Sequence, residues 1–371
     1  MRLQDVCTVF SDGDWIESKD QSNKGIRLVQ TGNIGEGLYL EKEERAKYVS
    51  EEIFESLKCT EIYPGDILIS RLPEPVGRAC IIPPKKERMI TAVDCTICRV
   101  DESIVSKEYL CYFMRSNAYY TKLLGSVTGT TRKRISRKNL GNIELEIPPK
   151  EEQTDVVSQL ECLINVINSR NKELQLFDNL IKARFVEMFG DVIHNSKKWQ
   201  VCLFAEITSS RLGKMLDAKQ QTGRNSYPYL ANFNVQWFRF NLENLNKMDF
   251  DEKDRAEFEL REGDLLVCEG GEIGRCAVWH NELQPCFFQK ALHRVRCNHQ
   301  IILPDYLAWW FRYNCDYGGF SALAGAKATI AHLPGAKLKQ LQVAVPPMEL
   351  QEQFAVFVAQ TDKSKVAVRK Y

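Results

Sequence analysis

Histidine, net charge and long apolar runs are all scarce in this chain. It has 5 histidines in 371 residues, and its 50 basic and 49 acidic side chains leave a net charge of +1. No run approaches the roughly 20 apolar residues that cross a membrane, and the first residues lack the apolar core of a signal peptide. We therefore expect a cytoplasmic protein. Any case for nucleic-acid binding must rest on how its charge is distributed.

Cysteine is plentiful but does not form a metal-binding pattern. The 13 cysteines are odd in number and scattered, which predicts reduced thiols buried as small apolar residues. Cys95 and Cys98 form a lone CxxC pair. Cys268, Cys276, His280 and Cys286 have spacings that match no compact zinc site. The sequence therefore predicts no metal and no cofactor on this chain.

The motifs of the enzymes that act on DNA are also missing. An adenine methyltransferase needs Asp, Asn or Ser before a Pro-Pro-aromatic sequence to hold the flipped base. Here Ile147 and Val345 precede the two Pro-Pro pairs, and Lys150 and Met348 follow them. No Gly-rich loop ending in Gly-Lys-Ser/Thr is present to cradle ATP phosphates. We therefore predict a chain without catalytic residues of its own.

A tandem repeat is the most informative feature that is present. Several unlike segments match at one offset of about 198 residues and in the same order, which indicates a duplication. The matching segments are Gly65–Ile69 with Gly263–Val267, Val76–Ile81 with Ile273–Val278, and Ile147–Pro149 with Val345–Pro347. Short apolar strand patterns interrupted by a few helical ones predict an α+β fold for each copy. The length suits two such domains.

A long helix is predicted after Pro149. Apolar residues recur every 3.5 positions from residue 150 to 189, broken by Arg170 and Arg184, as in a coiled coil about 60 Å long. Such a seam needs a partner helix, and the segment after Pro347 is the candidate. The predicted docking positions are Val156, Leu160, Leu163, Ile167, Leu174, Phe177 and Ile181, with Phe354 and Val358 in the second repeat.

Two similar units linked by a rod suit a ligand with two separated sites, and duplex DNA is the obvious one. The basic residues concentrate in Arg132–Lys138, after a loop of small and hydroxyl residues. The counterpart loop 326–333 is less basic, so the two units should read different sequences. The predicted DNA-binding residues are Gln30, Thr31, Asn33, Arg71, Arg78, Thr130, Thr131, Arg132, Lys133, Arg134, Asn232, Asn234, Arg275, Lys327 and Thr329.

Two less specific interpretations of these residues remain open. The basic stretch is also compatible with an ordinary solvated face. Arg71, Arg78 and Arg275 could equally brace the turns in which they lie.

These paired features resemble the specificity subunits of type I restriction-modification systems. The resemblance rests on the duplicated Gly-Asp strand with its Gly-Arg turn, and above all on two Pro-Pro-x-Glu-x-Gln elements that open a helix. It also rests on Phe185–Asp191, which looks like the usual end of the central helix, followed by Trp199. The similarity extends over nearly the whole chain.

The resemblance implies a division of labour among subunits. Two target recognition domains each read half of a bipartite site in double-stranded DNA. Long conserved helices form an antiparallel coiled coil that sets the spacer and docks two methyltransferase subunits. S-adenosylmethionine, ATP and Mg belong to the methyltransferase and restriction subunits.

The implied domains are 1–148 and 191–346 for target recognition, 149–190 for the central helix and 347–371 for a short C-terminal helix. The last helix is either truncated or completed by another polypeptide. Two other functions remain open: a stand-alone two-domain regulator that binds nucleic acid, and a coiled-coil scaffold that does not. The heptad seam favours docking to partners over the lone regulator, and the basic loop favours DNA over the scaffold.

Overall fold

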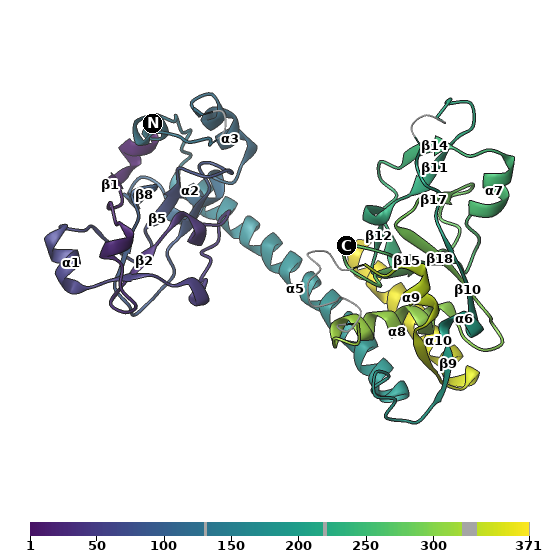
Figure 1. Ribbon diagram of the computed structural model, residues 1–371. Coiled ribbons are helices and arrows are strands. Elements are labelled where there is room, and N and C mark those ends of the chain that lie inside the picture. Colours follow the sequence, from purple (N-terminus) through teal and green to yellow (C-terminus); the bar gives the residue numbers. More distant parts are fainter. Residues whose placement is uncertain (130–131, 218–220, 321–331, 371) are drawn as a thin grey trace. The chain divides into compact units, whose positions relative to one another are not determined.

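The computed structural model describes residues 1–129, 132–217, 221–320 and 332–370. The chain divides into two compact units, unit 1 (Met1–Asn168) and unit 2 (Ser169–Tyr371) (Figure 1). Among the described residues, no helix is both long and apolar enough to cross a membrane.

Unit 1 contains two sheets of short strands, one antiparallel and one mixed, with small helices beside them. One sheet has the order β1-β8-β5-β6 and the other the order β3-β2-β7-β4. The strands are β1 (Cys7–Asp12), β2 (Ile26–Val29), β3 (Tyr48–Val49), β4 (Glu61–Ile62), β5 (Ile67–Ser70), β6 (Ala79–Ile81), β7 (Met89–Thr91) and β8 (Cys95–Val100). The helices are α1 (Glu51–Ser56), α2 (Lys107–Phe113), α3 (Asn117–Leu124) and α4 (Arg137–Gly141).

Unit 2 repeats the first of these sheets as β10-β18-β15-β16. Its strands are β9 (Gln200–Leu203), β10 (Thr208–Leu212), β11 (Ser226–Leu230), β12 (Val235–Gln236), β13 (Arg239–Phe240), β14 (Asn246–Asp249), β15 (Leu265–Cys268), β16 (Cys276–Val278), β17 (Phe287–Phe288), β18 (Leu292–Cys297) and β19 (Gln342–Val345). Its helices are α6 (Phe204–Ile207), α7 (Glu252–Phe258), α8 (Pro304–Asp316), α9 (Gly335–Lys339) and α10 (Met348–Lys370). The predicted α+β class and the duplication are both confirmed.

The repeated Gly-Asp pair builds a turn and a buried ion pair. Gly65 has a positive φ of 94°, and Asp66 accepts a hydrogen bond from the Tyr63 backbone N–H at 2.8 Å. The same carboxylate accepts from Arg99 on β8 at 2.8 Å. Asp264 makes the equivalent contacts with the Arg261 N–H and Arg296. The motif therefore fixes the start of β5 or β15 to its neighbouring strand.

The glutamine of each Pro-Pro-x-Glu-x-Gln element is a buried clamp. Gln351 on α10 donates to the Pro346 and Ile301 carbonyls at 2.8 and 3.1 Å, and its Oε1 accepts from the Leu303 N–H at 2.9 Å. Gln153 contacts the Pro148 and Ile104 carbonyls and the Ser106 N–H in the same way. One amide side chain thus joins the start of each long helix to the entry of α2 or α8.

We expect Gln351→Ala to lower the free energy of unfolding by about 2–4 kcal/mol, because several buried backbone groups lose their partner at once. Gln353→Ala is the matched control, since Gln353 is exposed and its side-chain amide donates to the Glu349 carboxylate at 3.4 Å. Urea unfolding of both variants measures the difference. Equal midpoints for the two would refute the clamp.

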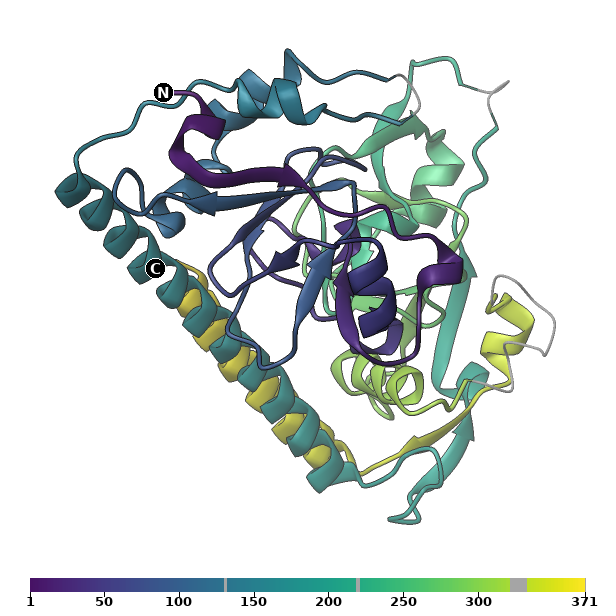
Figure 2. The same ribbon diagram turned by 90° about the vertical axis from the view of Figure 1, so that its left-hand side faces the viewer.

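The predicted long helix is α5 (Lys150–Phe189), which has 40 residues (Figures 1 and 2). In unit 2 its second half packs against α10. The Phe185 and Phe354 ring centroids are 5.5 Å apart, and Lys365 pairs with Asp178 at 2.8 Å. Phe354 precedes Lys365 in α10, whereas its partner Phe185 follows Asp178, the partner of Lys365, in α5. The two helices are therefore antiparallel, as predicted.

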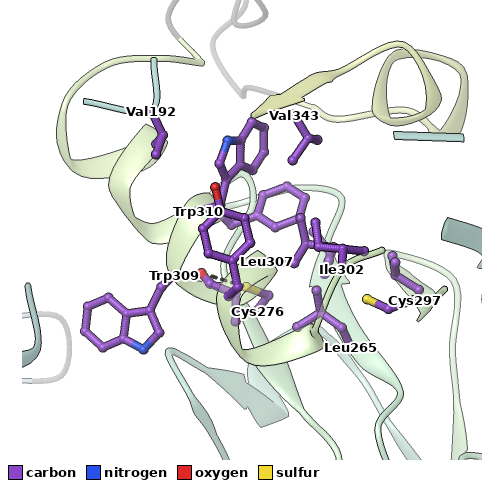
Figure 3. Packing of buried hydrophobic residues seen from close by; sticks show 14 of the residues in the cluster. Val192, Leu265, Cys276, Cys297, Ile302, Leu307, Trp309, Trp310 and Val343 are labelled. Carbon is purple, nitrogen blue, oxygen red and sulfur yellow. Dashed lines mark hydrogen bonds between the residues drawn. The ribbon is translucent and has the colours of Figure 1, made fainter. Parts of the chain in front are cut away.

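The main core of unit 2 lies where this helix pair meets α8 and the sheet. Figure 3 shows Leu307 and Trp310 of α8 in the same cluster as Leu265, Cys276 and Val343. Cysteines serve here as small apolar residues, and burial raises the pKa of the Cys297 thiol to about 12. The prediction that most cysteines are buried reduced thiols is confirmed.

Candidate nucleic-acid interface

Two of the predicted residues, Arg71 and Arg78, lie at one end of the β1-β8-β5-β6 sheet of unit 1. Strands β1 and β5 end there and β8 begins there, because Asp12 lies opposite Thr96 and Ser70 lies opposite Cys95. We call this the loop end of unit 1, formed by Asp12–Asp14, Ser70–Arg71, Arg78 and Asp94–Cys95. Polar groups at strand ends are well placed to contact a ligand because they stand clear of the sheet hydrogen bonds.

Arg71 fastens the basic loop to this loop end. Its side chain is only 5% exposed and donates to the Val93 and Ile135 carbonyls at 2.5 and 3.4 Å. Its Nε lies 3.3 Å from the Asp12 carboxylate. The Arg71 carbonyl in turn accepts from the Ile135 N–H at 3.2 Å. In this structure Arg71 is a brace that positions the residues around Ile135.

The basic loop itself presents its cations to solvent. Thr128 and Arg134 exchange two backbone hydrogen bonds of 2.9 Å, so the loop has a closed neck. Arg132, Arg134 and Lys138 are exposed and form no ion pair within the described part of the chain, whereas Lys133 pairs with Glu74 at 2.6 Å. Thr130 and Thr131 lie outside the described residues. The stretch Arg132–Lys138 is therefore a site of concentrated positive charge.

The side chains of Arg78 and Asn33 form hydrogen bonds within unit 1. Arg78 donates to the Ile34, Pro73 and Thr31 carbonyls at 2.7, 2.7 and 2.9 Å. Asn33 is buried, and it accepts from the Gln30 N–H while donating to the Leu40 carbonyl. Gln30 and Thr31 remain half-buried beside it. In the structure Arg78 braces the surrounding turns. A DNA contact by these four residues stays a prediction.

Unit 2 has an equivalent loop end. The Leu333 N–H donates to the Glu269 carbonyl at 2.7 Å, as the Ile135 N–H does to Arg71. Arg275 donates to the Asn232 carbonyl at 3.0 Å, and Asn232 donates to the Gly270 carbonyl at 2.9 Å. Asn234 is fully buried and caps the Ala231 N–H. Lys327 and Thr329 lie outside the described residues.

The predicted docking positions differ in exposure along α5. Leu163 and Ile167, in unit 1, are 58% and 56% exposed. Val156, Leu160, Leu174 and Phe177 are half-buried, and Ile181 is buried. In α10, Phe354 is buried and Val358 packs against the same core. An apolar stripe therefore remains on the solvent side of α5 in unit 1.

A model of the type I restriction modification DNA specificity domain matches this chain twice, over residues 1–176 and 196–370. A putative type I restriction enzyme specificity subunit of Haemophilus influenzae is 32% identical over 154 residues, which is 40% of this chain and 37% of the relative. The EcoKI specificity subunit of Escherichia coli K12 is 20% identical over 70% of this chain and 59% of its own. The matched parts thus span between about a third and three fifths of these relatives' lengths.

Solved structures agree on the fold. A chain from a study of type I R-M complex assembly covers this chain fully, with a TM-score of 0.58 and 16% identity over 91% of its own length. The S subunit of a type I system from M. genitalium gives a TM-score of 0.56 at 12% identity, over 90% of its length. The two matches to the family model together cover nearly every residue. The chain belongs to the family of type I restriction-modification DNA specificity subunits, and it contains two copies of the family's domain.

Proposed function

We propose that this chain is the DNA-reading subunit of a type I restriction-modification complex, and that each unit reads one half of a bipartite duplex target. The observation that carries the proposal is the repeated loop end. In both units a loop is tied by a backbone hydrogen bond to the residue that follows the central strand, Arg71 or Glu269. Two similar surfaces on one chain match two half-sites.

We expect the two loop ends to contribute unequally to DNA affinity. Unit 1 offers Arg132, Arg134 and Lys138 to the phosphate backbone, where cations supply affinity that does not depend on sequence. Unit 2 has the half-buried acidic residue Glu269 at its loop end, and a carboxylate repels phosphates. The half-sites are therefore expected to differ in sequence and in their share of the affinity.

In this proposal the chain performs no chemistry. It holds DNA for two methyltransferase subunits and for restriction subunits, which carry S-adenosylmethionine, ATP and Mg. The helices α5 and α10 set the spacer between the half-sites. The exposed apolar side chains of Leu163 and Ile167 support a docking role, because a heptad stripe in water favours burial against a partner.

Selection of random duplex DNA by the purified full-length chain, alone and with its methyltransferase, tests the proposal. We expect enrichment of two short sequences separated by an unread spacer of fixed length. Enrichment of one continuous site, or of no site, would contradict it.

The docking stripe gives a separate prediction. We expect Leu163→Lys with Ile167→Lys to abolish copurification of the methyltransferase, because two lysines cannot be buried unpaired in an apolar contact. The melting temperature of the chain alone should change little, since both side chains are already exposed. Glu161→Lys, on the same helix and exposed, is the control. Retention of the methyltransferase by the double variant would argue against this stripe as its docking surface.

A further inference from the structure

Glu269 stands where unit 1 has Arg71, but it lacks the partner that Arg71 has. Both residues follow the central strand of their sheet, and both donate a backbone N–H across it, to Ala291 and Asp94 respectively, at 2.9 Å. Arg71 pairs with Asp12 at the end of β1. The residue in the same register at the end of β10 is Leu212, opposite His293, just as Asp12 lies opposite Thr96. The ion pair of unit 1 is thus replaced by a carboxylate and an apolar side chain.

Among the described residues, no cation pairs with the Glu269 carboxylate. It is half-buried, and within the described ranges it forms no hydrogen bond or ion pair. His293 is close enough to interact with it electrostatically, but the imidazole is buried and bonds the Leu333 carbonyl at 3.0 Å. Burial lowers the pKa of His293, so the ring is neutral at physiological pH and does not balance the charge.

The position of Glu269 is nevertheless fixed on both sides. Its N–H is bonded to Ala291, and its carbonyl accepts from Leu333 at 2.7 Å. The next residue, Gly270, accepts from the Asn232 side chain at 2.9 Å. An acidic side chain held in a fixed, partly exposed position weakens DNA binding, because its carboxylate repels phosphates. A hydrogen bond from a base to the Glu269 carboxylate would compensate for this repulsion.

We propose that Glu269 is a base-reading residue of unit 2, and that its carboxylate accepts a hydrogen bond from the exocyclic amino group of a cytosine in the major groove. This inference rests on the proposed function. Cytosine is the base that fits, since its groove edge presents the N4 amino donor, whereas adenine sets an N7 acceptor beside its N6 donor and would repel a carboxylate. Arg71 of unit 1 is buried and paired with Asp12, so we do not include it in this proposal.

The test uses the full-length chain, with its methyltransferase, in selections from random duplex DNA. For Glu269→Ala we expect the preference for cytosine at one position of one half-site to fall about 10- to 100-fold, with the other half-site unchanged. Glu269→Gln keeps the size of the side chain and adds a donor. It should therefore shift the preference at that same position from cytosine toward adenine.

The outcomes distinguish failure of the Glu269 inference from failure of the proposed function. If the wild-type chain selects a bipartite site and both variants select the same bases as wild type, Glu269 does not read DNA, although the proposed function stands. If the wild-type chain selects no bipartite site, the proposed function fails and this inference fails with it. A general loss of binding by Glu269→Ala, with Glu269→Gln unchanged in base preference, would assign Glu269 a structural role and also overturn the inference.

Discussion

Replacing Arg132, Arg134 and Lys138 together with alanine is expected to weaken binding of the full-length chain to its DNA target by about 10- to 100-fold near physiological salt. Arg132 and Arg134 belong to the loop whose neck is closed by Thr128 and Arg134, and Lys138 follows in α4. All three exposed cations can reach phosphates without breaking an ion pair among the described residues. Each lost phosphate contact should also lower the slope of log affinity against log salt by about 0.9. Fluorescence anisotropy across a salt series measures both effects.

The matched control removes the same charge elsewhere in unit 1. Lys24, Lys58 and Lys86 are exposed and lie outside the basic stretch Arg132–Lys138. Their alanine variants should leave the salt slope within about one unit of wild type. Equal losses in the two triple variants would mean that only total charge matters, and the loop would then have no special role.

Phe185→Ala is expected to destabilise unit 2 by about 3–5 kcal/mol. The Phe185 ring contacts Phe354 of α10 and Tyr306 of α8, with centroid separations of 5.5 and 5.8 Å. It also contacts Phe189 at 5.0 Å. Removing it leaves a cavity where the two long helices meet the sheet core, so the melting temperature should fall by roughly 6–20 °C.

Tryptophan fluorescence reports mainly the unfolding of unit 2, because five of the six tryptophans lie there and only Trp15 lies in unit 1. Leu180→Ala is the control, since Leu180 is on the same helix but 49% exposed. It should lower the melting temperature by no more than about 2–4 °C. A similar fall for both variants would show that the helix junction is not a main source of stability.

The parts of the fold that depend on local patterns were predictable from sequence. The 3.5-residue spacing predicts a helix from 150 to 189, and α5 has these bounds. The Gly-Asp pairs are turns, as expected from glycine at positive φ beside a capping carboxylate. Repetition itself predicted two similar units, because a matched order of motifs requires no knowledge of contacts.

Side-chain direction at the candidate site could not be predicted in the same way. Arg71 and Arg78 lie in polar loops, yet both are buried, because backbone carbonyls from distant segments such as Val93 and Ile34 converge on them. Their burial depends on tertiary contacts that no local pattern encodes. Comparison of the repeats finds Glu269, since the 198-residue offset aligns it with Arg71. That no described residue takes the place of Asp12 beside its carboxylate followed only from the register of β10.

The most direct test of the account is to co-express this chain with its methyltransferase in cells and map the methylated bases across the genome. We expect one methylated motif with two defined halves, separated by a spacer of constant length. We further expect that changes confined to unit 2, such as Glu269→Gln, alter only one half. Methylation at a single undivided motif, or changes in both halves from a substitution in one unit, would contradict the account.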